Sequence, residues 1–380
     1  MPSPASERVA ELDGWRGIAA VMVVVTHVAY VTGFVVSGGG PGALTARLDI
    51  GVTVFFLLSG YLLYRPWITA AVGLGPEPSL GTYALRRAAR IVPAYVVALV
   101  VVLGFLPQAG DPEPWVWAAN ATFTQIYVPG ALVEGFTQTW SVATEVAFYV
   151  FLPGIAWVAG RAWRRDPLVG HVAMLVAMVA AGCAFVAGRA FGLLEGWPLS
   201  GFWLPGFLDW FALGMLAALL AQARAAGRLP RLTSLMTVIA GERAACLTAG
   251  VLIVVLLATP IAGPCTLDPA GSWAVLVKHV GYGAAAAALL LPAFLGLEGP
   301  RGPRGRVLAS PAATWLGRIS YGVFLWHLAA MWAILDLTEH PTFSGGFSWL
   351  LPSTLLAAAA VASLSWRFLE QPVLRRAHRP

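Results

Sequence analysis

The sequence predicts an all-α, polytopic membrane helix bundle with about ten transmembrane helices. Hydrophobic residues make up 58% of the 380 residues, and charged residues only 11%, against about 25% in a soluble globular domain. The mean hydropathy is +0.75, and apolar segments long enough to cross a bilayer recur along the chain. These observations exclude a soluble enzyme, a disordered chain and a nucleic-acid-binding protein, because the net charge of +6 is spread thinly.

Ten apolar segments account for the predicted spans, each near the ~20 residues that a bilayer core of ~30 Å requires. In chain order they are residues 14–35, 49–71, 91–107, 141–160, 171–190, 203–222, 245–262, 273–297, 313–337 and 347–367. The first segment resembles a signal peptide in position, but it is long and carries Arg16 and His27, so we expect an uncleaved helix. No linker is long enough for a second domain, so residues 1–380 are predicted to form one membrane domain without an appended soluble domain.

The distribution of basic residues predicts the orientation, because cytoplasmic loops of membrane proteins are rich in Lys and Arg. With the N-terminus in the cytoplasm, the outer side keeps only Arg47, Arg189 and Lys278 of the 24 basic residues. The sequence therefore predicts a multi-pass protein of the plasma membrane with both termini cytoplasmic.

Polar side chains inside the apolar segments are the best pointers to function, because a charge at mid-bilayer costs roughly 2.5–3.5 kcal/mol on the insertion scale. They are Arg16, His27, Ser59, Glu145, Asp209, Lys278, His279 and His327. Their depths in the membrane are estimated at 1.5 Å per helical residue. From these depths we expect five side chains to converge in one cavity in the outer half of the membrane, namely His27, Ser59, Glu145, Asp209 and His327. Asp209 and His327 are equally compatible with a structural role, and Lys278 and His279 are expected at the interface.

Arg16 and His27 lie eleven residues apart, which places both on one face of a helix, about 16 Å apart along its axis. A cation at the entrance and an ionisable base deep inside suit the wall of a channel. A snorkelling arginine and a packed histidine fit the same spacing equally well.

A second cationic group is Arg86-Arg87-x-x-Arg90, expected at the cytoplasmic start of the third span. Any one of these arginines is compatible with simple positive-inside anchoring. Three within five residues also suit a phosphate clamp, because guanidinium groups pair bidentately with phosphate. With Arg16 nearby, a phosphate-rich donor is expected to dock from the cytoplasm.

Seven short motifs, in order from residue 12 to residue 372, together resemble acyltransferase family 3 of membrane-bound O-acyltransferases. The motifs are Leu12-Asp13-Gly14-Trp15-Arg16-Gly17, Arg16-x10-His27, Phe55-Phe56-Leu57-Leu58-Ser59-Gly60-Tyr61, Arg86-Arg87-x-x-Arg90-Ile91-x-Pro93, Thr139-Trp140-Ser141-Val142-x-x-Glu145-x-x-Phe148-Tyr149, Ile319-Ser320-Tyr321-x-x-Phe324-x-Trp326-His327 and Phe368-Leu369-Glu370-x-Pro372. One departure is Thr53, where many members carry Asp.

The resemblance implies transfer of an acyl group from cytoplasmic acyl-CoA, acetyl-CoA above all, to a hydroxyl of an envelope sugar, a lipid-linked glycan or a glycosylated natural product. It implies that His27 is the catalytic histidine and Arg16 its partner. Further site positions are Asp13, Ser59, Arg86, Arg87, Arg90, Glu145, Tyr149 and His327. The partners implied are a hydroxyl-bearing acceptor, membrane lipids and a possible separate extracytoplasmic protein, with no nucleic acid and no metal.

The residue chemistry fits this activity. A hydroxyl is a poor nucleophile until a base removes its proton, and histidine is the usual base near neutral pH. We expect His27 to be that base and Glu145 to orient it or stabilise its charged form. The sequence has no G-x-S-x-G elbow, no H-E-x-x-H and no metal-ligand cluster, which argues against a serine nucleophile and a metal mechanism. Ser59 is expected to be a small helix-packing residue beside Gly60.

Two other classes of protein remain compatible with the composition. One is a transporter or flippase that moves a glycan or lipid without acyl chemistry, although inverted repeats typical of transporters are not visible. The other is an inactive acyl-CoA sensor, against which the retention of both Arg16 and His27 argues.

Overall fold

The computed structural model describes residues 10–163, 165–266, 268–295 and 307–377, and within them the chain is helical without any β-strand. The helices are α1 (Ala10–Val31), α2 (Phe34–Ser37), α3 (Gly39–Ala46), α4 (Ile50–Ala71), α5 (Leu80–Phe105), α6 (Pro114–Ala121), α7 (Trp140–Ala162), α8 (Pro167–Ala190), α9 (Leu208–Ala225), α10 (Pro230–Gly241), α11 (Arg243–Leu257), α12 (Ser272–Phe294), α14 (Pro311–Leu337), α15 (Phe347–Ser365) and α16 (Gln371–Ala377). The predicted all-α class is confirmed.

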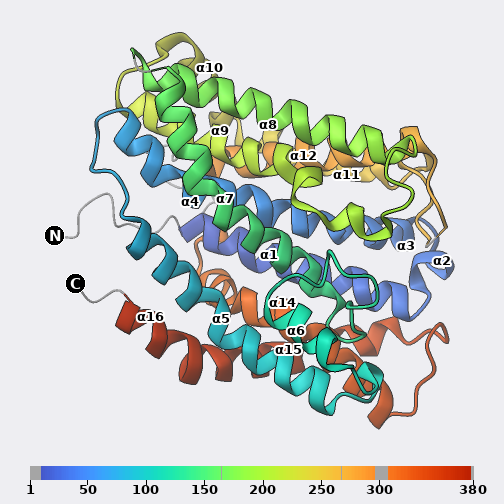
Figure 1. Cartoon of the computed structure of the whole chain (residues 1–380). Coiled ribbons are helices and arrows are strands. Elements are labelled where there is room, and N and C mark those ends of the chain that lie inside the picture. The colour runs from blue at the N-terminus through green and yellow to red at the C-terminus, as the bar shows by residue number, and fades with distance from the viewer. Residues whose placement is uncertain (1–9, 164, 267, 296–306, 378–380) are drawn as a thin grey trace.

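Nine helical stretches of the described chain are long and apolar enough to cross a membrane. The bent pair α10–α11, with an angle of 78° between its helices, makes a tenth if the pair crosses as one span. In Figure 1 the start of α1 lies at the same end of the bundle as α10 and α16, as an even number of crossings requires. We call this the terminal end, and the end that holds α2 and α3 the opposite end.

Two predicted spans have different bounds in the structure. The third predicted span, 91–107, corresponds to α5. This helix begins at Leu80 after the N-cap Ser79, eleven residues before the predicted start. The arginines of its first turns lower the hydropathy there without interrupting the helix, because arginine is a good helix former. The predicted span 245–262 corresponds to α11, which ends at Leu257 and is preceded by a bend, since α10 ends at Gly241 and α11 begins at Arg243.

Glycines allow the central helices to approach closely. A Cβ atom at Gly214 of α9 would lie 1.9 Å from the carbonyl oxygen of Leu57, and one at Gly60 of α4 would lie 2.2 Å from that of Phe211. On the other side of the core, a Cβ atom at Gly317 of α14 would lie 2.1 Å from the carbonyl oxygen of Asp13. These contacts hold α4 against α9 and α1 against α14, as small residues do in membrane helix packing.

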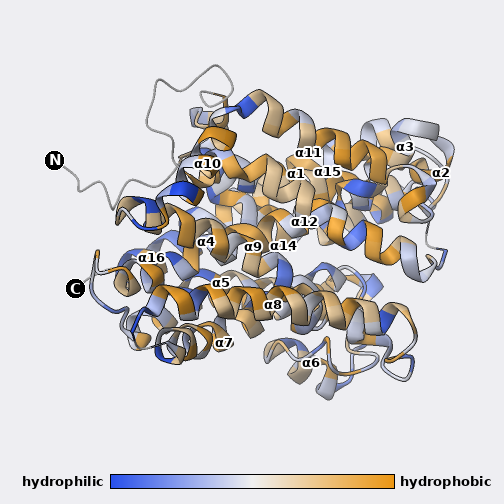
Figure 2. Cartoon of the chain, turned by 90° about the horizontal axis from the view of Figure 1, so that it is seen from above, coloured by the Kyte–Doolittle hydropathy of each residue, from blue (hydrophilic) through white to orange (hydrophobic). Residues whose placement is uncertain are grey.

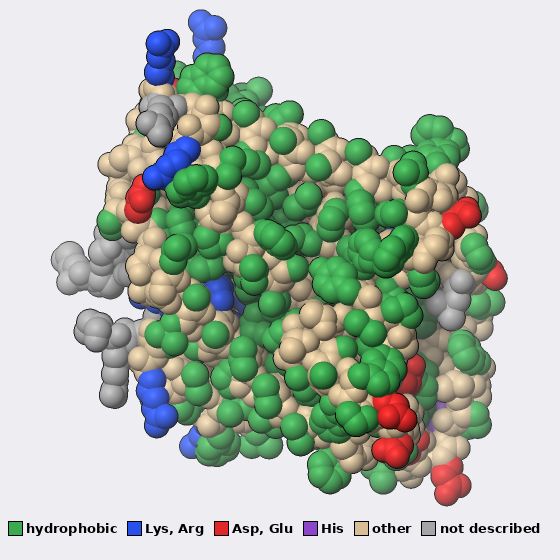
Figure 3. All heavy atoms as spheres, in the orientation of Figure 1, with side chains coloured by type: hydrophobic (Ala, Val, Ile, Leu, Met, Phe, Trp, Pro, Cys, Tyr) green, Lys and Arg blue, Asp and Glu red, His purple; other side chains and the backbone are tan. Residues whose placement is uncertain are grey.

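The surface is divided by charge and hydropathy. Figure 2 shows apolar residues along the outward-facing helices, and on α5 the exposed side chains include Val96, Val97 and Val100. On the face shown in Figure 3, Lys and Arg gather toward the terminal end and most Asp and Glu toward the opposite end. An apolar belt between two charged ends is the surface expected of a membrane-spanning bundle.

Candidate functional site

A cavity of about 580 Å³ lies between α1, α4, α5, α7 and α14. Its lining includes eight of the predicted site residues, namely Asp13, Arg16, Ser59, Arg86, Arg87, Arg90, Glu145 and Tyr149. Figure 3 shows basic side chains within a recess near the terminal end. The structure thus brings together residues that lie up to 136 positions apart in the sequence, from Asp13 to Tyr149. His27 and His327 are not among the lining residues.

The arginines of the cavity differ in how they are held. Nε of Arg16 is buried without a hydrogen-bond partner in the described chain. Arg90 instead pairs with the fully buried Glu370 (Nη1 to Oε2, 3.1 Å). Its guanidinium also lies 5.7 Å from the ring centre of Tyr321 and 5.4 Å from that of Trp366. Arg90 is therefore held in place by the wall of the cavity.

Glu370 is a residue whose role sequence reasoning missed. It lies in the π-helical turn Trp366–Glu370, which connects α15 to α16. Its Oε1 accepts a hydrogen bond from Ser365 (3.3 Å), while its Oε2 binds Arg90. Glu370 belongs to the last of the seven sequence motifs. The motif alone does not show that the carboxylate binds an arginine 280 residues earlier in the chain.

Glu145 lies deep in the cavity and is held by two hydroxyl groups. Its Oε1 accepts hydrogen bonds from Ser59 and from Tyr149 (2.5 Å). The expectation that Ser59 is only a packing residue is therefore wrong: the packing is made by Gly60, and Ser59 binds the carboxylate. The side chain of His27 pairs with His327 rather than with Glu145.

The two histidines form a pair between α1 and α14. Nδ1 of His27 lies 3.1 Å from Nε2 of His327 and 2.9 Å from the carbonyl oxygen of Val23. His327 is fully buried, and its Nδ1 lies 2.7 Å from the carbonyl oxygen of Phe324. His27 keeps part of its surface exposed. The ring of Phe324 lines the cavity, so the pair and the cavity share a wall.

The prediction that all the deep polar residues converge in one cavity is wrong. Only Ser59 and Glu145 of that set line the cavity, while the histidines pair beside it. Asp209 pairs with His279 (Oδ2 to Nε2, 2.8 Å), and both side chains are buried. His279 also stacks on Trp210, with ring centres 4.5 Å apart. The pair joins α9 to α12 within the bundle.

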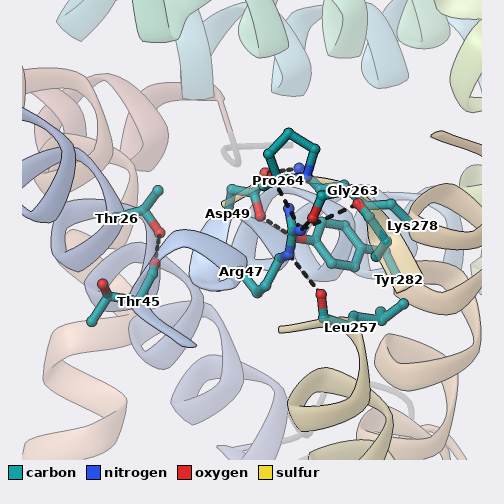
Figure 4. A network of polar contacts seen from close by, with 10 residues as sticks. Thr26, Thr45, Arg47, Asp49, Leu257, Gly263, Pro264, Lys278 and Tyr282 are labelled. Atoms are coloured by element: carbon teal, nitrogen blue, oxygen red, sulfur yellow. Dashed lines mark hydrogen bonds and ion pairs between the residues drawn. The ribbon is translucent and has the colours of Figure 1, made fainter. Parts of the chain in front are cut away.

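A separate polar network lies toward the opposite end of the bundle (Figure 4). Asp49 accepts hydrogen bonds from Tyr282 and from Nζ of Lys278 (2.8 Å). Lys278 is thus a half-buried ion-pair partner rather than a free interfacial cation. Sequence reasoning missed Asp49 because this residue stands at the very start of a predicted span.

Arg47 completes this network and is itself 2% exposed. Its Nε donates to the carbonyl oxygen of Leu257 (2.8 Å). Its Nη2 lies within hydrogen-bond distance of three more carbonyls, those of Ala262, Gly263 and Pro264 (Figure 4). The arginine therefore ties the start of α4 to the loop after α11.

These features define a class: a multi-pass helical membrane protein with an arginine-lined cavity beside a histidine pair. The chain belongs to acyltransferase family 3, because the family model described as "Acyltransferase domain" matches residues 9–367. No solved structure matches the chain.

Curated relatives carry acyltransferase names. Acyltransferase MdmB of Streptomyces mycarofaciens is 31% identical over 160 residues, 40% of each chain. Peptidoglycan O-acetyltransferase OatA of Listeria monocytogenes is 24% identical over 96% of this chain and 56% of its own length. The putative membrane-bound transacylase BcsY of Komagataeibacter xylinus is 24% identical over 95% of this chain and 82% of its own. The matches thus span about half or less of the length of the first two relatives.

Proposed function

We propose that the protein is a membrane O-acyltransferase. It moves an acyl group, acetyl or another short chain, from acyl-CoA to a hydroxyl of a sugar, a glycan or a glycosylated natural product. One observation carries the proposal: in a member of this family, a cavity lined by five arginines shares the wall made by Phe324 with a histidine pair. An anion-binding chamber and a base are the two parts that this reaction needs.

The cavity would hold the donor by its phosphate groups. Guanidinium groups bind phosphate bidentately, and partial burial strengthens such contacts by excluding water. Arg16 supports this role because its Nε is a buried donor with no partner in the described chain, and such a donor gains most from an incoming anion. Arg86 is exposed and Arg87 half-buried, so they lie toward the mouth of the cavity.

His27 would act as the general base. About 16 Å along α1 separates it from Arg16, so a donor held by its phosphates must extend its thioester arm toward the histidine. The acceptor oxygen attacks the thioester carbonyl carbon, and the C–S bond breaks. The hydroxyl proton passes to the His27 imidazole and then to the leaving sulfur, which gives an ester and free CoA.

Within the cavity, Glu145 would position groups rather than accept the substrate proton. Its Oε1 already accepts two hydrogen bonds, from Ser59 and Tyr149. Together with Asp13, these residues would shape the deep part of the donor site.

The acceptor class rests on the relatives. One relative is named a peptidoglycan O-acetyltransferase, which supports an envelope glycan or a related glycoside as acceptor. We also propose that the terminal end faces the cytoplasm, where acyl-CoA is made, because Lys and Arg gather there. Reporter fusions after residue 225 and at residue 380 are expected to read cytoplasmic, and an extracytoplasmic signal from either contradicts this orientation.

The test is acyl-CoA turnover by the purified protein in lipid nanodiscs, with envelope glycan extracts as acceptors. Wild type is expected to release free CoA thiol and to give an acylated product by mass spectrometry. His27→Ala is expected to lower turnover by about 10²–10⁴-fold, the usual effect of removing a general base. It is expected to stay folded and to keep its acyl-CoA affinity. Near-wild-type turnover of His27→Ala overturns the assignment of the base. No donor consumption by wild type with any extract favours a transporter instead.

A further inference from the structure

The histidine pair is held at three points. Nδ1 of His27 faces the carbonyl oxygen of Val23 at 2.9 Å, and Nδ1 of His327 faces that of Phe324 at 2.7 Å. Between the rings, Nδ1 of His27 lies 3.1 Å from Nε2 of His327. The ring centres are 4.9 Å apart. Three of the four ring nitrogens therefore have a defined partner.

The two carbonyl groups decide where the protons are. A carbonyl oxygen only accepts hydrogen bonds, so the nitrogen that faces it must carry the proton. The carbonyl group of Phe324 thus favours the tautomer of His327 that carries hydrogen on Nδ1. In this tautomer, Nε2 of His327 is a hydrogen-bond acceptor. Val23 sets the same tautomer in His27, whose N–H is then shared between the carbonyl and Nε2 of His327.

The alternative arrangement is unfavourable at both ends. If Nε2 of His327 carried the proton and donated it to His27, both Nδ1 atoms would be bare. Each bare nitrogen would then face a carbonyl oxygen, lone pair against lone pair, in a site where His327 is fully buried. Nδ1 of His27 would still accept the bond from His327, but Nδ1 of His327 would be left without a hydrogen-bond partner. An unsatisfied buried polar group costs about 1–3 kcal/mol, so the first tautomer is favoured.

We propose that His327 is the positioning residue of the active site: its Nε2 accepts the Nδ1–H of His27, fixing the ring and leaving Nε2 of His27 bare to take the acceptor proton. The inference rests on the proposed function, in which His27 is the base. His327 would take the place that a carboxylate has behind the histidine of a catalytic triad, but as a neutral acceptor.

The proton balance of this arrangement closes. The acceptor proton moves to Nε2 of His27, which becomes an imidazolium while Nδ1 keeps its hydrogen. The bond from that hydrogen to His327 strengthens, because its donor is now charged. When Nε2 gives the proton to the leaving sulfur, His27 returns to its starting tautomer, and His327 has neither gained nor lost a proton.

Two variants of similar size test whether His327 positions the ring of His27 or only fills space between the helices. His327→Leu fills the site without an acceptor, whereas the amide oxygen of His327→Gln can reach the place of Nε2. We expect His327→Leu to lower kcat by about 10- to 100-fold, as loss of a hydrogen-bond partner behind a functional histidine does, with an unchanged KM for acyl-CoA. His327→Gln is expected to recover much of this loss. His171→Gln is the control, because His171 is also buried but pairs with Tyr64, away from the cavity; its kcat is expected to stay at the wild-type value.

Two outcomes overturn the proposal while leaving His27 as the base. One is His327→Leu and His327→Gln with equal kcat; the other is a wild-type kcat for His327→Leu when His27→Ala is inactive. A readout without turnover uses ¹⁵N-histidine NMR of the wild type in nanodiscs, with signals assigned by loss in His27→Ala and His327→Leu. We expect a protonated Nδ1 and a bare Nε2 at His27. A proton on Nε2 of resting His27 overturns the proposal whatever the activity.

Discussion

Arg16 and Arg47 are both arginines within membrane-spanning stretches, but the structure uses them in opposite ways. Arg47, toward the opposite end, directs its guanidinium at four backbone carbonyls. Arg16, in the cavity near the terminal end, has a buried Nε without a partner in the described chain. A charged side chain opposes membrane insertion, and for Arg47 this cost is offset by hydrogen bonds to backbone carbonyls.

The difference teaches how to distinguish a structural charge from a functional one. A charged group whose hydrogen-bonding capacity is used within the protein holds helices together. A charged group with unused capacity in a cavity is available to a ligand.

Replacing Arg47 is expected to have the largest effect on folding. Arg47→Ala leaves several buried carbonyls without a donor, so the folded state should lose about 3 kcal/mol or more. The measurement is thermal unfolding in nanodiscs, with Arg86→Ala, an exposed position, as the matched control. An unchanged melting temperature for Arg47→Ala contradicts the structural reading of this arginine.

Replacing Arg16 is expected to act on the donor rather than on the fold. A hydrogen bond to a charged group is worth about 1.5–3 kcal/mol, so Arg16→Ala should raise the KM for acyl-CoA by about 10- to 100-fold. The melting temperature is expected to stay near that of wild type, because no described residue forms a hydrogen bond with the Nε. If Arg16→Ala instead unfolds the protein and Arg47→Ala only weakens the donor, the comparison is reversed.

A conservative change at Arg87 is expected to have the smallest effect on the KM for acyl-CoA. Arg87→Lys keeps the charge but loses the bidentate fork, so the KM for acyl-CoA should rise only several-fold, about the worth of one hydrogen bond. The half-buried position predicts that added salt weakens donor binding moderately. Titration of acyl-CoA at two salt concentrations measures both effects. A KM equal to that of wild type would place the phosphates away from Arg87.

Much of the fold followed from local sequence, and its errors have local causes. The ten apolar segments correspond to nine long helices and the bent pair α10–α11 of the described chain. The start of α5 was misplaced because a hydropathy window ends where arginines begin, although the helix continues to its cap at Ser79. The bend before Arg243 was missed because apolar length does not report the direction of the backbone.

The sequence by itself determined the membrane class, the family resemblance and the residues whose polarity must be explained, since each follows from composition or from short-range spacing. Only the tertiary structure decided their partners: His327 for His27, Ser59 and Tyr149 for Glu145, and Glu370 for Arg90. The physical reason is that helix contacts set by glycines, such as Gly317 against Asp13, fix which faces meet. A side chain in a bundle then bonds to whatever its neighbouring helix presents at the same depth, and no spacing within one helix contains that information.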